Sequence, residues 1–581
     1  MSEGFAVGID LGTSTSEVCV FRNGRAEAIN IPGSRSPIMP SYVGLNPRNE
    51  ILVGEPARGI VDTEDRGVRE VKRKMGTDER VRLGGKEYRP QEISALILRQ
   101  LKETAEAHLG APVSQAVISV PANFDDLAKR ATYEAAEIAG LKVLLLVAEP
   151  TAAALAWGID HLDAEEQVLV FDFGGGTLDI TILEMVSGII DVRCSFGDVA
   201  LGGKNFDEVM IALLKQRVIQ QVPNLSLSPN VDRDLKAIAE KTKISLSTES
   251  ASDIFLRAIG MSVGRQVDLD VTVTREEYEE RCQPLLKRTR DCLLSALRTK
   301  EIKPSVISKV ILVGGTTYIP AVRRVVEETL GRTGSIEVDP DLAVGLGAAI
   351  RAGMVTGLVD PLKSVVATDV APKGVGVSII EMIGSRPTLV YEPLIKPNAT
   401  IPYHMKKIYY LISDEQDIVN LDVYQDSTGR ARLPEDAKLI MSGKITGIPP
   451  SEDGKPHPIE ISFQYDISGT IRLEGRIAAT GQAVLIEERI SATLMTEGEK
   501  KASEARMHDL WLTRPQAREY RAVLAKAERV LDQVDAERRR ILQECIVSLK
   551  QAIEAESETE ARRHGDRLVD LLYDFERETE E

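Results

Sequence analysis

The stretch Val168–Thr181, VLVFDFGGGTLDIT, decides the fold of this chain. An apolar strand ends near Asp172, the glycines Gly174–Gly176 form a turn, and Thr177 leads into a second strand. Glycines let the backbone approach a phosphate closely and point its N–H groups at it. A carboxylate at the end of an apolar strand is costly unless it is paired or holds a cation. The hairpin therefore indicates a site for a metal-bound polyphosphate, and the alternative is a glycine-rich hairpin with an incidental aspartate.

A second turn of the same kind opens the chain. Phe5–Ser16, FAVGIDLGTSTS, contains an apolar strand, Asp10, Gly12 and a run of hydroxyl residues, and another strand follows at Glu17–Phe21. Two such turns predict a duplicated lobe with one phosphate-binding hairpin from each half. A P-loop is not the alternative, because no GxxxxGK[ST] occurs and the LGGKN at 201–205 fails its spacing.

Length, charge and cysteine usage bound the class of protein. A chain of 581 residues predicts about three to five units of ordinary domain size. Its 72 basic and 89 acidic residues give a net charge of −17, which argues against a general nucleic-acid or anionic-membrane binder. We expect no secretory signal, since the first residues lack a basic region followed by an apolar run, and no apolar run approaches the roughly 20 residues of a membrane span. The five scattered cysteines argue against structural zinc or disulfides, so the expectation is a multidomain cytoplasmic protein.

Predicted helices and strands alternate between the two hairpins. Pro90–Leu109 carries a helical apolar stripe, 116–121 is a buried strand, and Asn123–Ala139 begins with a cap-like asparagine and continues as a helix. Leu141–Val147 is another strand, after which Glu149 precedes small residues that start a helix at Ala152–Ala154. Glu149 is either a buried functional carboxylate or a helix-start acid favoured by the helix dipole.

The second lobe contains more glycine-bearing junctions. Ala200–Asp207 places a glycine pair before a helix at Phe206–Val218, and Lys309–Pro320 runs from strand through a glycine pair to helix. Leu235–Leu246 is predicted to be a basic amphipathic helix. The lysines of such a helix most often face the solvent. The GLGAAI within Asp339–Gly353 lacks the third glycine of a dinucleotide fingerprint, and we interpret it as close helix packing.

The spacing of apolar residues changes twice in the second half of the chain. Val359–Val370 is interpreted as a linker with a short apolar centre at 365–367, and an edge strand is the alternative. From Asp369 to about Ile490 the apolar period is two, which predicts a β-sandwich. Glu497–Glu581 is charged and helical, with apolar stripes typical of a small helix bundle. The predicted short strands of the sandwich are Lys406–Leu411, Val419–Tyr424, Ile459–Tyr465 and Thr470–Ala478.

Six motifs, in chain order, resemble the DnaK-type seventy-kilodalton heat-shock chaperones: IDLGTSTS, ISVPANF, AEPTAAALAWG, FDFGGGTLDI, ILVGGTTYIP and VGLGAAI. The resemblance covers about Phe5 to Ile490 and implies a divergent, short-lidded bacterial member. The implied fold is an α/β, actin- and hexokinase-like two-lobed ATPase domain (1–358), a linker (359–370), a β-sandwich peptide-binding domain (371–496) and a C-terminal α-helical lid (497–581). ATP binding would open the peptide cleft, and slow hydrolysis would close it on an extended apolar segment of a client protein.

The resemblance also implies roles for individual residues. Asp10 and Asp172 would hold Mg²⁺ through its waters, with K⁺ as a further candidate ion. Lys72, in VKRKMG, would lie beside the γ-phosphate, Glu149 would orient the attacking water, and Asp172 and Thr177 complete the catalytic set. The other residues that would bind ATP or ADP are Gly12, Thr13, Ser14, Gly174, Gly175, Gly176, Gly202, Gly203, Glu240, Lys243, Ser247, Gly314, Gly315, Ile319 and Asp341.

The implied peptide cleft has Val419 in a central pocket and Ile380 and Ile412 arching over the peptide. Ordinary sandwich core is the alternative for each of these three residues. The expected partners are unfolded or extended client polypeptides, with no nucleic acid and no membrane. Two rival functions are a small-molecule kinase of the actin superfamily and a scaffold or nucleotide-exchange protein with little turnover. The predicted β-sandwich and helical tail speak against the kinase.

Several positions depart from the family's pattern. Ala148 stands where asparagine is common, Lys204 where an acid is usual, and Tyr318 where an arginine often covers the adenine, so altered ATP affinity is expected. Leu144–Leu145 replaces a basic pair that helps to dock the J-domain co-chaperone, so any J-protein would be a dedicated one. The short 248–273 segment puts the usual nucleotide-exchange factor in doubt, and the small apolar centre of the linker predicts weaker coupling between domains.

Overall fold

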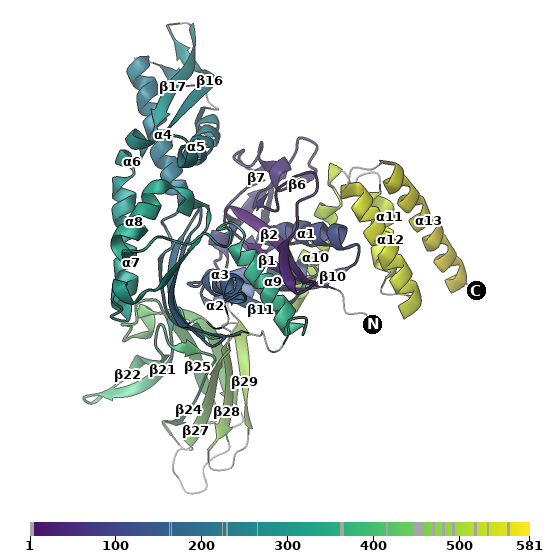
Figure 1. Cartoon of the computed structure of the whole chain (residues 1–581). Helices are drawn as coiled ribbons and strands as arrows, with labels where there is room; N and C mark the ends of the chain where they lie inside the picture. The colour runs from purple at the N-terminus through teal and green to yellow at the C-terminus, as the bar shows by residue number, and fades with distance from the viewer. Residues whose placement is uncertain are drawn as a thin grey trace. The chain divides into compact units, whose positions relative to one another are not determined.

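A computed structural model describes residues 5–161, 163, 165–222, 225–227, 231–263, 265–360, 365–413, 416–446, 448, 458–466, 471–478, 483–490, 494–515, 520–531, 534–554 and 558–580 (Figure 1). The chain divides into two compact units. The first unit comprises Met1–Leu155, Ile189–Arg193 and Gly345–Glu581, and the second comprises Ala156–Gly188 and Cys194–Val344. Among the described helices, none combines the length and apolar character needed to span a membrane. The five cysteines are free and buried, as expected from their scatter.

The first unit is built on a mixed sheet with the strand order β11-β10-β1-β2-β3. Its three strands β1, β10 and β11 run parallel to one another, and β2 returns antiparallel to β1. Because parallel strands end at the same edge of a sheet, the residues that follow β1, β10 and β11 lie together. The strands are β1 (Phe5–Leu11), β2 (Thr15–Arg22), β3 (Arg25–Ala28), β4 (Met39–Pro40, beside β2), β10 (Val113–Val120) and β11 (Lys142–Ala148).

Short strands and three helices accompany this sheet. α1 (Pro90–Leu109) has the predicted bounds, opens with a proline and ends at Gly110 in the left-handed region. α2 (Asp126–Ile138) begins three residues later than predicted, because the Asp125 carboxylate, not Asn123, accepts the Ala128 N–H. α3 (Glu149–Gly158) begins three residues earlier than predicted, since Glu149 itself occupies the first turn. The short strands are β5 (Val43–Leu45), β6 (Ile51–Val53), β7 (Gly67–Val68), β8 (Val81–Leu83) and β9 (Lys86–Tyr88).

Helix α9 (Ala343–Val355), which carries GLGAAI, packs closely on its neighbours. A Cβ added at Gly347 would lie 1.8 Å from the Ala152 carbonyl oxygen, and one at Gly8 of β1 would lie 2.0 Å from the Ala349 nitrogen. Only glycine fits at such distances, so the interpretation of GLGAAI as close helix packing is confirmed.

The second unit has a sheet with the order β18-β12-β13-β14. β12 and β13 are the two arms of the glycine hairpin, and β18 runs parallel to β12 with Asp172 opposite Val313. Its strands are β12 (Glu165–Phe173), β13 (Leu178–Val186), the part of β14 (Ile189–Asp198) from Cys194 onward, β15 (Ser226–Leu227), β16 (Ala251–Ser262), β17 (Arg265–Thr274) and β18 (Lys309–Val313). Its helices are α4 (Gly203–Gln221), α5 (Val231–Thr248), α6 (Arg275–Arg281), α7 (Gln283–Thr299) and α8 (Pro320–Leu330).

The predicted linker is partly a strand. In β19 (Val366–Ala367), the two residues pair in parallel with Ile189 and Ile190 of β14, within the first unit. The Thr368 N–H donates to the Ile190 carbonyl at 2.9 Å, and the Thr368 hydroxyl donates to the Asp191 carboxylate at 2.7 Å. The edge-strand interpretation is therefore confirmed for 366–367, while 361–364 lie outside the described residues.

The predicted sandwich is an eight-stranded sheet with the order β22-β21-β25-β26-β29-β28-β27-β24. Buried residues of β21, β25 and β26 share one core with those of β27 and β28, so the two halves of the sheet enclose apolar side chains. Thr470 and the predicted turns at 414 and 451–454 lie outside the described residues. The strands are β20 (Asp369–Val370), β21 (Gly374–Ile383), β22 (Arg386–Ile395), β23 (Thr400–Ile401), β24 (Tyr403–Tyr410), β25 (Val419–Asp426), β26 (Lys438–Thr446), β27 (Pro458–Tyr465), β28 (Ile471–Ile477) and β29 (Ala483–Ile490).

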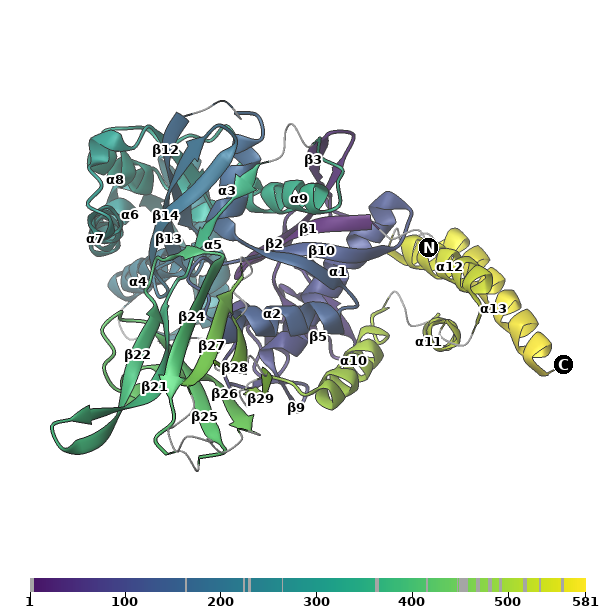
Figure 2. The same cartoon turned by 90° about the horizontal axis from the view of Figure 1, so that it is seen from below.

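Four helices end the chain: α10 (Glu497–Trp511), α11 (Arg521–Val530), α12 (Ala536–Glu554) and α13 (Glu558–Glu580). The last three share a core of the predicted apolar stripes, including Leu524, Leu542 and Leu568. α10 packs on α1 and α2, and α12 packs on α1 (Figure 2).

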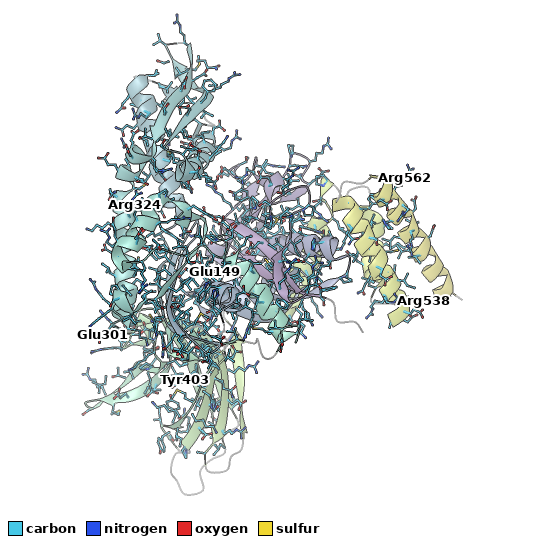
Figure 3. The ribbon with its side chains drawn as sticks, viewed as in Figure 1. Glu149, Glu301, Arg324, Tyr403, Arg538 and Arg562 are labelled. Atoms are coloured by element: carbon cyan, nitrogen blue, oxygen red, sulfur yellow. The ribbon has the colours of Figure 1, made fainter. Side chains whose placement is uncertain are left out.

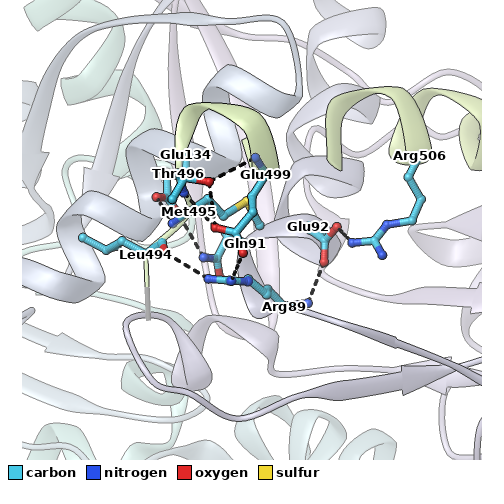
Figure 4. Close-up of polar contacts among 9 residues, drawn as sticks. All are labelled: Arg89, Gln91, Glu92, Glu134, Leu494, Met495, Thr496, Glu499 and Arg506. Atoms are coloured by element: carbon cyan, nitrogen blue, oxygen red, sulfur yellow. Dashed lines mark hydrogen bonds and ion pairs between the residues drawn. The ribbon is translucent and has the colours of Figure 1, made fainter. Parts of the chain in front are cut away.

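The segment that leads into α10 is held by its own backbone (Figure 4). The Arg89 guanidinium donates to the Leu494 carbonyl at 3.1 Å, and the Glu134 carboxylate accepts the Met495 N–H at 2.7 Å. Arg89 also pairs with Glu499 at 2.8 Å. The start of α10 is therefore anchored to Arg89, just before α1, and to Glu134 of α2, partly through main-chain groups of Leu494 and Met495.

Candidate functional site

Asp10 lies at the end of β1, beside the parallel strand β10. The Ser119 hydroxyl donates to its Oδ1 at 2.5 Å. Burial raises the pKa of Asp10, while the Lys72 ammonium and the Ser119 hydrogen bond oppose this rise. A half-buried carboxylate in this setting gains from a cation that approaches it.

Lys72 and Glu149 form a buried ion pair, with Lys72 Nζ 2.5 Å from Glu149 Oε1. Their side chains are only 4% and 12% exposed. Burial raises the pKa of the Glu149 carboxyl, Lys72 opposes the rise, and Asp10 adds to it. Figure 3 labels Glu149, which starts α3 directly after β11. Glu149 is therefore both the helix-start acid and a buried carboxylate with a charged partner, so the two interpretations of this residue are compatible.

The turn after β1 is tightly built. The Gly12 N–H donates to the Ser16 hydroxyl at 3.2 Å, and the Ser41 hydroxyl donates to the Gly12 carbonyl at 2.9 Å. A Cβ at Gly12 would lie 2.0 Å from the Thr15 carbonyl oxygen, so the turn requires glycine. Among the described residues, no acceptor is recorded for the backbone N–H of Thr13 or Ser14. These amides are available to a phosphate.

The glycine hairpin of the second unit uses its carbonyl groups for structure. The Gly174 carbonyl accepts the Gly203 N–H at 3.0 Å and the Thr316 hydroxyl at 2.8 Å. The Gly175 carbonyl accepts the Lys204 N–H at 3.0 Å. Within the described part of the chain, no acceptor is recorded for the Gly175 or Gly176 N–H. The hairpin thus turns its carbonyls to α4 and leaves amide donors unused.

The other predicted glycines surround this hairpin. A Cβ at Gly202 would lie 2.5 Å from Gly175 O, and one at Gly203 would lie 2.7 Å from the Thr316 hydroxyl. Gly314, at φ +81, would place a Cβ 2.6 Å from the Phe173 carbonyl oxygen. Packing against the hairpin alone requires glycine at these positions, so their presence does not by itself indicate a ligand.

Asp172 is almost fully buried near the end of β12, opposite Asp179 on β13. Thr177 closes the turn, with its carbonyl accepting the Gly174 N–H at 3.1 Å. Because β18 runs parallel to β12, Asp172 and Gly314 lie at the same edge of their sheet. This edge therefore brings a carboxylate, a threonine and two glycine turns together.

Glu240, Lys243 and Ser247 lie on one face of α5, half-buried. Lys243 Nζ is 2.7 Å from Asp207 Oδ1 and 3.4 Å from the Gly203 carbonyl oxygen, so α5 is tied to the start of α4. The Ser247 hydroxyl donates to the Lys243 carbonyl at 3.3 Å. Lys243 therefore does not belong to a solvated face.

Gly315 and Asp341 lie close together, since a Cβ at Gly315 would be 3.3 Å from Asp341 Oδ1. Burial, with a contribution from Asp339, raises the pKa of Asp341 to about 6. Ile319 is 5% exposed and belongs to the hydrophobic core of the second unit, so its side chain presents little surface to a ligand.

Tyr318 stands beside an arginine from the next turn. The Arg323 guanidinium carbon lies 5.4 Å from the centre of the Tyr318 ring, and the Tyr318 hydroxyl donates to Asp339 at 3.0 Å. A planar cation therefore lies over the face of the Tyr318 ring.

The predicted peptide-binding residues lie past the end of a shared strand ladder. β21 pairs with β25 from Gly374 to Val377 and beyond this point pairs only with β22, so Ile380 and Val419 belong to the diverging part. Ile380 is 52% exposed and Ile412 is 70% exposed, whereas Val419 is half-buried. The core alternative therefore does not hold for Ile380 and Ile412. Other exposed apolar residues nearby in sequence are Met382, Ile383, Leu389, Ile408, Tyr410 and Ile418.

Five residues of these sites were not foreseen: Ser119, Phe124, Asp207, Thr316 and Arg323. Ser119 was recognisable as a polar residue inside the buried strand AVISVP. The Phe124 ring lies 5.7 Å from Lys72 Nζ, and no sequence pattern links the two. Asp207 and Thr316 contact Lys243 and Gly174 across large sequence separations, which sequence spacing alone does not reveal.

Comparison with known proteins gives the family. Residues 6–81 and 77–580 match the model of the HSP70 family, described as "Hsp70 protein". The chain is 40% identical to "Chaperone protein DnaK" of Thermotoga maritima over 484 residues, which is 82% of this chain and 79% of that protein. It is 39% identical to the protein of the same name from Thermotoga neapolitana over 515 residues, covering 86% and 84% of the two chains.

These similarities do not favour the kinase and scaffold alternatives. A family match that extends through the sandwich and the C-terminal helices leaves no part of the described fold to be explained by another class of protein. The family has a two-lobed ATPase domain and a substrate-binding domain, binds nucleotide, and acts on unfolded polypeptides. The chain belongs to the Hsp70 family and is an ATP-hydrolysing molecular chaperone.

Proposed function

We propose that the residues at the two sheet edges, one in each unit, carry the ATPase reaction of this chaperone. The observation that carries the proposal is the buried Lys72–Glu149 pair beside Asp10, at the carboxyl ends of three parallel strands. Ligand positions of α/β sheets lie at such edges. Phosphoryl transfer to water needs positioning and charge neutralisation rather than covalent groups, and a lysine with ordered amides supplies both.

Asp10 and Asp172 are proposed to hold Mg²⁺ through its water molecules, as the resemblance to the family implies. Among the described residues there is no cluster of three or more histidine, cysteine or carboxylate side chains that could hold a metal directly. Mg²⁺ keeps several waters and binds through one or two carboxylates and the substrate phosphates, so two separate carboxylates are the expected donor set. When bound, the ion neutralises phosphate charge.

Each group of residues has a proposed task. The amides of Thr13, Ser14, Gly175 and Gly176 bind the phosphates, and Lys72 neutralises charge that develops on the γ-phosphate. Glu149 orients the attacking water. The ribose and adenine are assigned to the half-buried face of α5 (Glu240, Lys243 and Ser247) and to the Gly315–Asp341 contact, with Arg323 stacked on Tyr318 beside it.

The test is single-turnover ATP hydrolysis by Lys72→Ala. We expect hydrolysis to fall at least about 100-fold, the usual range for loss of a transition-state charge partner, while the far-UV circular dichroism spectrum is kept. Lys74→Ala is the matched control, because Lys74 lies in the same short helix, is 41% exposed and pairs with Glu79. Thr177→Ala should also abolish hydrolysis. A normal rate of ATP hydrolysis in the Lys72→Ala variant would contradict the proposed mechanism.

The peptide cleft is proposed at the diverging ends of β21 and β25, with Ile380, Ile412 and Val419 as its apolar contacts. Exposed apolar residues gather in 380–389 and 408–418, and such exposed patches mark interaction sites. We assign 1–358 as the ATPase domain, 359–370 as the linker, 371–496 as the peptide-binding domain and 497–581 as its helical lid.

Proposals for partner proteins follow from the positions at which this sequence departs from the family's pattern. Leu145 lines the same small cavity as Ala367 and Thr368 of the linker, so the loss of the basic pair alters the surface next to the linker. We propose a dedicated J-protein that does not rely on this pair. We also propose that any exchange factor differs from the usual one, because the segment 248–273, which contains the β16–β17 hairpin, is short against the family's pattern. The free buried cysteines suit action in the cytoplasm.

A further inference from the structure

A cavity lies between α4, α5 and β16 of the second unit (Figure 1). Its volume is about 240 Å³. Protein interiors are close-packed and keep few voids larger than a water molecule, so a space of this size is unusual and has room for a small ligand. Its walls include Val218 and Ile219 of α4, Val231 and Leu235 of α5, and Ile259 of β16.

The lining of the cavity is aliphatic. Val218, Leu235 and Ile259 form its base and are 3%, 1% and 2% exposed. Among the described residues that line the cavity, Lys215 has the only polar side chain, and the others are Val, Leu or Ile. A buried water molecule needs about two to four polar partners, which these side chains do not supply. Apolar cavities of about 150 Å³ stay dry and bind small hydrocarbons such as benzene, and this cavity is larger.

Lys215 and Ile219 lie at the mouth of the cavity, because their side chains are 40% and 65% exposed. Lys215 Nζ is 2.6 Å from Asp232 Oδ1, so an ion pair joins α4 to α5 there. The hydrogen bond from Lys215 lowers the pKa of the Asp232 carboxyl. The lysine is therefore already neutralised, and an anionic ligand would have to displace this carboxylate. An uncharged ligand leaves the pair intact.

The surface around the mouth is charged. Arg233 and Lys236 of α5 are exposed neighbours of Asp232, and Lys236 also lowers the pKa of the Asp232 carboxyl. The core of a protein–protein interface is depleted in charged residues, so this surface does not resemble one. The apolar surface is confined to the cavity, which fits a small molecule better than a protein partner.

We propose that this cavity binds a small, uncharged aliphatic molecule, with its hydrocarbon part against Val218, Leu235 and Ile259. The ligand gains because its apolar surface leaves water, and it makes dispersion contacts with the lining. Further along, α5 carries the residues proposed to contact the nucleotide, but the assignment of the cavity does not rest on those contacts.

The probes are octanol and octanoate, which have chains of the same length and differ in charge. Each is titrated into the full chain with isotope-labelled isoleucine methyl groups, and the NMR signal of Ile259 is followed. Ile408 is the control signal, because it is an exposed isoleucine of β24 in the first unit and reports binding to the sandwich. We expect octanol to shift the Ile259 signal in a saturable way. Octanoate should bind at least about tenfold more weakly, since its charge must lose its hydration or displace Asp232.

Val218→Phe is the decisive variant, because the larger side chain fills the base of the cavity. It should weaken octanol binding at least about tenfold, as expected when a ligand loses the burial of two or more methylene groups. Lys215→Gln should keep the octanol affinity. Lys241→Gln is the control for the lysine variant, because Lys241 is an exposed residue of α5 outside the lining.

Three outcomes would overturn the proposal. They are the absence of a saturable Ile259 shift in the parent, an unchanged octanol affinity in a folded Val218 variant, and tighter binding of octanoate than of octanol. The last result would make Lys215 an anion receptor. The titration of the parent decides the proposal even where the Val218 variant does not fold. ATP hydrolysis is no part of the readout, so a failure of the proposed ATPase residues leaves this test unaffected.

Discussion

At the scale of single residues, several of the residues proposed for the ATPase reaction are carboxylates whose ionisation is costly in the folded chain. Glu149, Asp10 and Asp341 all have pKa values raised by burial, so their ionised forms are destabilised in the folded chain. Residues in this state are typical of functional sites, where stability is given up for chemistry. Among them, Asp341 has the simplest surroundings, because the second cause of its shift is a single neighbour, Asp339.

Asp341→Asn should therefore stabilise the second unit. A carboxyl whose folded pKa is about 6, against 3.8 when unfolded, binds its proton more tightly in the folded state. Stability is then lost as pH rises from about 4 to about 6, and the asparagine variant avoids this loss. We expect its advantage to be at most about 3 kcal/mol above pH 6 and absent near pH 4.

Urea unfolding followed at several pH values measures this difference. Asp291→Asn is the control, because Asp291 is an exposed residue of α7 in the same unit. A gain in unfolding free energy for Asp341→Asn that is the same at pH 4 and pH 7 would contradict the raised pKa of Asp341. A loss of unfolding free energy at pH 7 would contradict it as well.

At the scale of elements, close packing of glycine-bearing helices sets the geometry of the first unit. Gly347 brings the backbone of α9 against α3, and Gly8 brings β1 against α9. The atoms that a Cβ would meet belong to the backbone, so they cannot move aside as a flexible side chain can.

Gly347→Ala should lower the midpoint of thermal unfolding by several degrees, since overpacking a close contact costs roughly 1–3 kcal/mol or more. Gly59→Ala is the matched control, because a Cβ there meets no atom within 4 Å. Scanning calorimetry compares the two. An unchanged transition in the Gly347 variant would show that α9 can shift without cost.

The sequence patterns predicted helices and strands better than they predicted contacts between side chains that are distant in the sequence. Both ends of α1 were predicted correctly, because the apolar stripe, the initial proline and the terminal glycine all agree. The start of α2 was wrong by three residues, because two cap-forming side chains compete and the Asp125 carboxylate makes the hydrogen bond. The candidate site was predictable where motifs carry it, as in the two hairpins. The stacking of Arg323 on Tyr318 and the contacts of Lys243 with α4 depend on tertiary packing that no spacing encodes.

At the scale of the whole molecule, we propose that the segment 359–370 links ATP hydrolysis to peptide binding. Val365 is 1% exposed, whereas its neighbour Val366, in the strand that pairs with β14, is 60% exposed. The apolar centre of the linker is short. We therefore expect ATP to accelerate peptide release less in this protein than in a relative with a leucine-rich linker. Acceleration equal to that of such a relative would contradict this expectation.

The most direct measurement is the release rate of a fluorescent, extended apolar peptide from the full chain, with ATP and with ADP, in the parent, Val365→Asp and Val366→Asp. If ATP binding controls the cleft, ATP accelerates release in the parent and in the Val366 variant. Burying a charge at 365 displaces the linker, so the Val365 variant should release at one rate with either nucleotide while it still hydrolyses ATP. Equal rates with ATP and ADP in the parent would contradict the account.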